Sequence, residues 1–290
     1  MPREALTPEQ EAKQAKYEKL PTGKCHISFS ELRTWSECSY RHKLKFIDKV
    51  GEDIPGVHMD FGTAIHEACE SYLKTRVMDK KIFLNKLKKL WIEHEPKDPK
   101  HGTKDASYTP EAFLSFGKEG IAILNDVPAW LEEQFPGWEY VDAEHALYEG
   151  LDLEGHPHAF KGYIDAIIRV PGHKGKYLAW LLDWKTTSWG WTAFKRSDEL
   201  VRAQLVLYKN FWSIKTGTDP KDVRCGFVLL KRSAKPGKHC ELVTTSVGEV
   251  TTGKSLTIIN NMVSSVKRGI AIKNRNSCQF CEFYATPRCV

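Results

Sequence analysis

Apolar positions in the first half of the chain recur at the spacing of amphipathic helices. In residues 60–77 they follow one another at three- and four-residue steps, at Phe61, Ile65, Ala68, Tyr72 and Leu73. This spacing predicts a helix with one buried face. Stretches 80–95 and 110–134 are also predicted as helices, separated by a polar, proline-containing segment. A further helix is predicted to begin at Ser30, as N-cap, and to continue to Phe46.

Between residues 139 and 187 the pattern changes to that of β-strands. We predict strands over 139–148, 158–170 and 177–186, and the last is almost wholly apolar, as is typical of a central strand covered on both faces. A helix over 197–216, a strand over 224–231 and a helix over 253–268 follow. These elements predict an α/β fold, a mixed sheet with helices on both faces. One domain is expected over 21–290, behind a polar tail or loosely docked helix over 1–20, where Thr7-Pro8-Glu9-Gln10 resembles a helix start.

Composition narrows the class of protein. The 290 residues are 41% hydrophobic and 28% charged, which excludes disorder as the main state. The longest apolar run, Tyr177–Leu182, is far shorter than the ~18–20 residues that a bilayer span needs. The first residues lack the apolar stretch of a secretory signal, so we expect a soluble cytoplasmic protein. The net charge of +6 permits nucleic-acid binding without demonstrating it.

Two carboxylates and a lysine are predicted to meet at the end of the central strand. Asp183 and Lys185 are two residues apart, so both side chains leave the same face. If Val170 pairs with Leu178 across the hairpin, Asp165 lies opposite Asp183, with Cβ atoms ~4.5–5.5 Å apart. Two carboxylates this close repel each other, and a bound Mg²⁺ or Mn²⁺ would relieve the repulsion. The alternative is an ordinary structural salt bridge of Lys185.

Three further features strengthen the functional interpretation. Gly162 stands three residues before Asp165, where a side chain would obstruct the close approach of another backbone. Gly62 lies one helical turn before His66 on the same face, which leaves the imidazole room to reach a metal ion and substrate. Gln204 and Tyr208, one turn apart on the next helix, either contact DNA or support the site.

These motifs, in this order, resemble the PD-(D/E)XK nuclease superfamily, specifically its RecB-type branch. The segment Ser28-Phe29-Ser30…Cys38-Ser39-Tyr40 is similar to the cysteine-containing helix of iron–sulfur members, among them the CRISPR-associated adaptation nuclease, AddB-like nuclease domains and phage exonucleases. The resemblance covers about residues 27–290. It implies a restriction-endonuclease-like core and metal-dependent cleavage of DNA phosphodiester bonds. The third motif has Asp183 where many relatives carry glutamate, and both variants of the pattern are allowed.

The resemblance also implies roles for the site residues. Asp165, Asp183, His66 and the backbone carbonyl of Trp184 would hold one or two Mg²⁺ or Mn²⁺ ions, and the ion would lower the pKa of a bound water. Lys185 would orient the attacking water or stabilise charge on the phosphate. The substrate would be linear duplex or single-stranded DNA ends, in recombination, repair or phage DNA metabolism. A recombination or replication protein is a further partner consistent with that setting.

Four of the eight cysteines form a separate group. Cys38 lies near the start and Cys278, Cys281 and Cys289 crowd the last residues, and four thiolates suit either a Cys₄ zinc site or an iron–sulfur cluster. Spacing does not choose between them, whereas the resemblance implies a [4Fe–4S] cluster. Such a cluster would join the N- and C-terminal segments and close a long loop of chain.

Aromatic residues beside cations follow the active strand. Trp189 and Trp191 precede Lys195 and Arg196, which suits a platform for stacking single-stranded bases, although tryptophans are more often part of a core. The predicted function is a metal-dependent DNA exonuclease. The alternatives are a structure-specific endonuclease and a non-catalytic nucleic-acid-binding iron–sulfur module.

Overall fold

A computed structural model describes residues 16–51, 56–104, 106–151 and 158–289. Their strands form one mixed sheet in the order β1-β3-β4-β5-β6, with β2 paired to β3. The bounds are β1 His26–Ser28, β2 Glu139–Gly150, β3 Ala159–Pro171, β4 Tyr177–Thr187, β5 Val223–Lys231 and β6 Cys240–Thr244. β3 runs parallel to β1 and antiparallel to β2 and β4, while β5 runs parallel to β4 and antiparallel to β6. The mixed sheet predicted from the sequence is confirmed, with β1 and β6 as additional edge strands.

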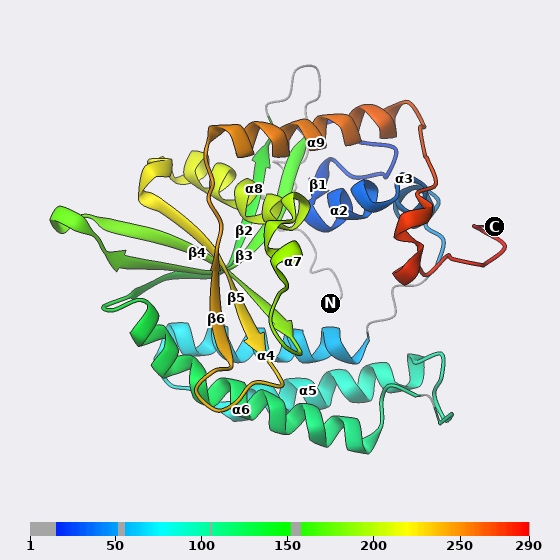
Figure 1. The fold of residues 1–290 in the computed structure, drawn as a ribbon. Coiled ribbons are helices and arrows are strands. Elements are labelled where there is room, and N and C mark those ends of the chain that lie inside the picture. Colours follow the sequence, from blue (N-terminus) through cyan, green and yellow to red (C-terminus); the bar gives the residue numbers. More distant parts are fainter. Residues whose placement is uncertain (1–15, 52–55, 105, 152–157, 290) are drawn as a thin grey trace.

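Helices cover both faces of this sheet (Figure 1). On one face α4 (Val57–Thr75), α5 (Lys80–His94) and α6 (Pro110–Gln134) share an apolar core with Ala166, Leu182 and Trp184 of the sheet. On the other face α8 (Glu199–Thr216) and α9 (Glu249–Lys267) pack on Leu181 and Phe227. Short turns of helix complete the described chain, at η2 Glu95–Lys97, η3 His173–Gly175, η4 Pro220–Asp222 and η5 Arg275–Phe280.

Local sequence signals account for where the long helices begin. α6 begins at Pro110, the residue type favoured at a first helical position, and the Thr109 hydroxyl accepts a hydrogen bond from the Ala112 N–H. Asp198 caps α8 in the same way through Leu200 N–H, which separates α8 from the short α7 (Ala193–Ser197). The single helix predicted over 197–216 therefore begins at Glu199, after an independent turn.

The N-terminal helical segment departs from the prediction. Ser28, rather than Ser30, is the N-cap of α2 (Phe29–Glu37), and its hydroxyl accepts from the Glu31 N–H. The helix expected to continue to Phe46 breaks at Cys38, whose backbone is extended, before α3 (Ser39–His42) and the π-helical turn η1 (Lys43–Ile47). The predicted N-terminal helix start at residues 7–10 and most of the turn after β2 lie outside the described residues.

The register of the β3–β4 hairpin is the one predicted, and its end creates a fork. Val170 pairs with Leu178, and pairing continues in step to Ala166 and Leu182, where it stops. Beyond this point β4 stays paired with β5 as far as Thr187. Asp165 and Asp183 are thus the first residues past the paired part of the hairpin, where β3 leaves β4.

Candidate active site

Asp183 and Lys185 form an ion pair on the last part of β4. The Lys185 Nζ atom lies 2.6 Å from Asp183 Oδ2, and the Asp183 side chain is almost fully buried whereas that of Lys185 is 34% exposed. Burial raises the pKa of Asp183, and the Lys185 charge opposes that rise. Burial alone would lower the pKa of Lys185, but the charges of Asp183 and Asp165 outweigh it and raise that pKa. Lys185 therefore stays protonated, and its positive charge compensates the buried negative charge of Asp183, which would be destabilising without a partner.

Asp165 and His66 meet on the other side of the fork. The His66 Nδ1 atom lies 3.6 Å from Asp165 Oδ2, and the Trp184 N–H donates a 2.8 Å hydrogen bond to the same carboxylate oxygen. Burial and the charge of Asp183 raise the pKa of Asp165 well above its usual range. Burial, followed by the Lys185 charge, lowers the pKa of His66 to about 3, and a hydrogen bond to the Trp184 backbone opposes this. His66 is consequently a neutral imidazole at pH 7, the form that binds metal ions.

The Gln204–Tyr208 pair supports Asp183 from α8. Gln204 Nε2 donates to Asp183 Oδ1 at 2.7 Å and to Tyr208 Oη at 3.1 Å. Tyr208 in turn packs where Gly162 has no side chain, because a Cβ atom there would lie 2.7 Å from Tyr208 Cε1. The close approach at Gly162 is thus to aromatic rings, and not to another backbone as we expected. These contacts fit the role of support for the site, and contact of Gln204 and Tyr208 with DNA stays a prediction.

Gly62 brings α4 close to the end of β4. A Cβ atom at Gly62 would lie 3.3 Å from Thr186 Oγ1, a tighter contact than most real Cβ atoms make. The lack of a side chain therefore allows α4 to approach β4 one turn before His66. Residues from both faces of the sheet, His66 from one and Gln204 from the other, reach the same pair of aspartates.

Glu144 on β2 is a neighbour of the site that sequence reasoning missed. Its flanking residues Ala143 and His145 pair with Ala166 and Ile164, which places Glu144 across from Asp165. Glu144 has φ +51°, a left-handed conformation that is unusual for glutamate. Burial, Glu70 and Asp183 raise the pKa of Glu144. Deriving the β2–β3 register from the sequence would have identified Glu144 as a third acidic residue beside Asp165 and Asp183.

The donor set suits a hard divalent cation, although the residues are not arranged around one. The two adjacent carboxylates offer the oxygen ligands that Mg²⁺ and Mn²⁺ prefer, and their raised pKa values reflect an electrostatic cost that a bound cation would relieve. Among the described residues, no three His, Cys, Asp or Glu side chains converge as the ligands of one ion do. Asp183 instead faces Lys185 and Gln204.

The two tryptophans after β4 differ in exposure. Trp189 is 71% exposed, whereas Trp191 is buried, with its ring centroid 4.9 Å from that of Phe227 and the Lys195 Nζ 4.8 Å from its own centroid. With Phe227 and Lys195 packed against it, Trp191 is a core residue. This corrects our expectation that it stacks on bases and leaves Trp189 as the exposed ring.

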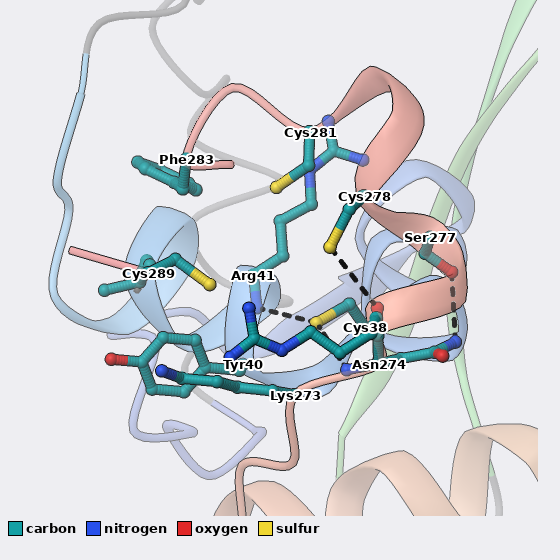
Figure 2. A pocket seen from close by; sticks show the side chains of 12 residues that line it. Cys38, Tyr40, Arg41, Lys273, Asn274, Ser277, Cys278, Cys281, Phe283 and Cys289 are labelled. Atoms are coloured by element: carbon teal, nitrogen blue, oxygen red, sulfur yellow. Dashed lines mark hydrogen bonds between the residues drawn. The ribbon is translucent and has the colours of Figure 1, made fainter. Parts of the chain in front are cut away.

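The four grouped cysteines line one pocket between the N- and C-terminal segments. Cys38, Cys278, Cys281 and Cys289 surround it in Figure 2. The Cys38 Sγ accepts hydrogen bonds from the N–H groups of Arg41 (3.5 Å) and Asn274 (3.4 Å). The Cys38 thiol itself donates to the Ile272 carbonyl at 3.7 Å, so contacts with the C-terminal segment hold the sulfur at the pocket. The four thiols are free in the structure.

Backbone contacts hold the two segments of this pocket together. Tyr40 N–H donates to the Ile272 carbonyl at 3.1 Å, and Ile272 N–H donates to the Ser39 hydroxyl at 2.7 Å. Arg41 adds an ion pair to Glu282 at 2.7 Å. The predicted proximity of Cys38 to the C-terminal cysteines is therefore present. A metal bound by the four sulfurs stays a hypothesis.

None of the helices in the described part of the chain is long and apolar enough to span a membrane.

Comparison with solved structures supports the fold. A structure described as a "putative exonuclease" from Eubacterium rectale is similar over 97% of this chain and 92% of its own, with a TM-score of 0.52 and 15% identity. A second structure, SSO0001, is 14% identical over 84% of this chain and 91% of its own. Its TM-score of 0.34 is too low to support an argument. Among curated proteins no match to the sequence is found.

A family model gives the relationship directly. The model of the PD-(D/E)XK nuclease superfamily matches residues 26–286, a span from β1 to the C-terminal cysteine segment. This span includes the hairpin with Asp165, Asp183 and Lys185, the α4 helix with His66 and the α8 helix behind Asp183. The chain belongs to the PD-(D/E)XK nuclease superfamily.

Proposed function

We propose that this protein is a Mg²⁺- or Mn²⁺-dependent deoxyribonuclease of the RecB-type branch that degrades DNA from its ends. The observation that carries the proposal is the fork between β3 and β4, where Asp165, Asp183, Lys185 and His66 gather within a nuclease superfamily fold. Its setting would be recombination, repair or phage DNA metabolism in the cytoplasm of a bacterial, archaeal or phage-infected cell, together with a recombination or replication protein.

Each residue has a role in this proposal. Asp165, Asp183, His66 and the Trp184 carbonyl would hold the cation, which supplies charge neutralisation at the phosphate and a water of lowered pKa. Lys185 keeps a proton next to Asp183 and would donate hydrogen bonds to the attacking water or to a phosphate oxygen.

Gln204 acts on the carboxylate rather than on the substrate. Its 2.7 Å hydrogen bond fixes the Asp183 Oδ1 atom, and Tyr208 fixes Gln204 in turn. A carboxylate held in one orientation loses less freedom when it binds an ion, which is the usual benefit of partners behind metal ligands.

The test is digestion of end-labelled DNA by the wild type and by Lys185→Ala and Asp183→Asn, with Mg²⁺ or Mn²⁺. We expect both variants to lose at least ~10³-fold in rate while keeping the wild-type circular dichroism spectrum. Lys88→Ala, at an exposed position of α5, is the matched control and should cleave normally. Full activity in Lys185→Ala contradicts the proposed site.

Substrate form separates exonuclease from endonuclease. An enzyme that begins at ends degrades linear DNA and spares a covalently closed circle of the same sequence. Cleavage of the circle at a comparable rate would instead identify the structure-specific endonuclease. Binding of DNA by the wild type without any cleavage, with either metal, would identify a non-catalytic module.

The same proposal includes a [4Fe–4S] cluster on Cys38, Cys278, Cys281 and Cys289, with structural zinc as the alternative. It is supported by their common pocket and by the N–H donors to the Cys38 sulfur. Protein purified without oxygen should be brown, with broad absorbance near ~400 nm, as expected of cysteine-ligated iron. Cys278→Ser should lose the colour, whereas Cys240→Ala, outside the pocket, should keep it. A colourless protein with stoichiometric zinc would select the alternative.

A further inference from the structure

Arg33 is a cation on α2, a helix that supplies none of the residues assigned to the site so far. The edge strand β1 runs parallel to β3, and its last pair joins Ser28 to Lys161, four residues before Asp165. α2 begins directly after this pair, so it starts beside the part of β3 that leads to the fork (Figure 1). Arg33 lies in the second turn of α2, and its side chain is 54% exposed.

The Arg33 charge acts on cations at the fork. Burial lowers the pKa of Lys185, the charges of the two aspartates raise it, and the Arg33 charge is a further cause that lowers it. Burial also lowers the pKa of Lys195 on α7, and Arg33 is the next cause, ahead of Lys185. Arg33 is therefore close to positive groups on two other elements, on the side of the fork where Lys185 lies.

Only one edge of the Arg33 guanidinium is in use. Its Nε atom donates to Glu37 Oε1 at 2.8 Å, one helical turn further along α2. In the part of the chain that the structure describes, its two Nη groups have no hydrogen-bond partner. Both Nη groups of Arg232, by contrast, are bound to the side chains of Glu119 and Ser188. A guanidinium fixed through Nε presents its Nη groups as a planar pair of donors, which matches two oxygens of a phosphate.

Glu37 is held from its other side by the C-terminal segment. Arg41 Nη1 lies 3.3 Å from Glu37 Oε2, and the Arg41 guanidinium also lies 2.7 Å from Glu282 Oε2, next to Cys281. Arg33, Glu37, Arg41 and Glu282 thus alternate in charge along one row. Exposed ion pairs contribute little to stability, so the main consequence of this row is the orientation of Arg33.

We infer that Arg33 is a further catalytic residue, whose Nη groups contact the non-bridging oxygens of the phosphate being hydrolysed, and that Glu37 positions it. This inference rests on the proposed nuclease function. Lys185 already compensates Asp183 at 2.6 Å, so a second cation facing the fork would offset the negative charge that develops on the phosphate.

The reaction leaves Arg33 unchanged. The attacking water forms the new P–O bond and loses a proton to bulk water, while the bond to the leaving oxygen breaks and that oxygen gains a proton. Arg33 keeps all its protons, because a guanidinium is not deprotonated in proteins. Its contribution is therefore electrostatic and depends on its position.

Steady-state cleavage of end-labelled linear DNA with Mg²⁺ tests this role. We expect Arg33→Ala to lower kcat about 10²-fold and to change KM less than about 3-fold, because the contact strengthens as charge develops in the transition state. Arg33→Lys keeps the charge without the planar pair of donors, so it should recover only part of the loss, to about 10-fold above Arg33→Ala. Circular dichroism and Tm should match the wild type in both variants.

Glu37→Ala tests the positioning. It should lower kcat about 5-fold or more in the wild type, since misplaced catalytic groups lose rate steeply. In the Arg33→Ala background it should cause no further loss, because no guanidinium remains to be oriented. A role in stability alone would give losses that add.

Arg169→Ala is the matched control. Arg169 also forms an ion pair with a glutamate, Glu139, and at 52% its side chain is about as exposed as that of Arg33. It lies on β3 toward the hairpin turn, where it pairs with Ala179. Its loss should leave kcat and KM unchanged.

Two results would overturn the inference: a wild-type kcat in Arg33→Ala, or a raised KM with kcat unchanged, which would make Arg33 a general contact to the DNA backbone. A further loss from Glu37→Ala in the Arg33→Ala background would reject the positioning role. Cleavage that depends on Lys185 and is normal in Arg33→Ala retains the nuclease and rejects the role of Arg33. A wild type that cleaves no DNA with either ion rejects the proposed function, and the role of Arg33 with it.

Discussion

The contact between Gly162 and Tyr208 links packing to the proposed site, and Gly162→Ala tests that link. The added Cβ atom would lie 2.7 Å from Tyr208 Cε1 and 3.0 Å from Phe160 Cε1, against ~3.5–4.0 Å for a comfortable carbon contact. Both rings are buried, so one of them or the strand has to move by up to about 1 Å. Overpacking of this kind costs ~1–3 kcal/mol. The expected loss in Tm is ~2–4 °C for each kcal/mol.

Gly162→Ala should also slow cleavage at temperatures where the variant is still folded. A displaced Tyr208 ring moves its hydroxyl away from Gln204, and Gln204 is the hydrogen-bond donor to Asp183 Oδ1. We therefore expect at least ~10-fold slower cleavage under conditions where the variant is still fully folded, since misplaced catalytic groups lose rate steeply.

A double-mutant cycle isolates the clash. Tyr208→Leu removes the closer of the two ring contacts and leaves Phe160 Cε1 at 3.0 Å, so Gly162→Ala should cost less stability in that background than in the wild type, although cleavage stays low. Gly253→Ala on α9 is the control, because a Cβ there has nothing within 4 Å, and alanine should be neutral or stabilise the helix by up to ~1 kcal/mol. Wild-type Tm and cleavage in Gly162→Ala would refute the reasoning.

Three more substitutions test other contacts. Gly120→Ala on α6 should lower the free energy of unfolding, measured by chemical denaturation, by about 3 kcal/mol or more, because the added Cβ would lie 2.1 Å from the fully buried Phe83 ring. Adding Phe83→Leu should recover part of that loss. Wild-type stability of Gly120→Ala would contradict the prediction. Glu144→Gly should raise Tm, because glycine adopts the φ of +51° without strain, and should slow cleavage if the carboxylate assists the site; unchanged cleavage would make Glu144 structural. Asp165→Asn should stabilise the metal-free protein, because burial and the nearby Asp183 make a charge on Asp165 unfavourable. In the wild type, Mg²⁺ at 100 times its Kd should stabilise the folded state by ~2.7 kcal/mol and so raise Tm, and Asp165→Asn should abolish that rise. A Tm that still responds to Mg²⁺ in that variant would place the ion elsewhere.

The parts of the fold that could be predicted are those with local causes. The turn between β3 and β4 is rich in proline and glycine, and its position allowed the hairpin register to be predicted. That register places Asp165 close to Asp183. The helix α6 matches its predicted bounds because Thr109 and Pro110 mark its start. The apolar character of residues 177–186 correctly indicated a strand with neighbours on both sides.

The parts that were missed depend on distant contacts. Cys38 breaks a helix without any glycine or proline nearby, and the partners that accompany the break, Ile272 and Asn274, are more than 230 residues away. The left-handed conformation of Glu144 is likewise not a preference of glutamate. Trp191 and Trp189 are equivalent in sequence pattern, and Trp191 is the buried one because Phe227 on β5 and Lys195 on α7 pack against its ring.

The fork between β3 and β4 explains why charged groups from both faces of the sheet meet at one place. Past Leu182 the Trp184 N–H donates to the Asp165 carboxylate, so a side chain takes the place that a strand carbonyl would fill in a continued ladder. Continued pairing would satisfy that N–H with backbone and would keep His66 and Gln204 on opposite sides of an unbroken sheet. By parting at this residue the strands leave Asp165 and Asp183 between the two helical layers. The buried charge that results is the feature a cation and a phosphate would compensate.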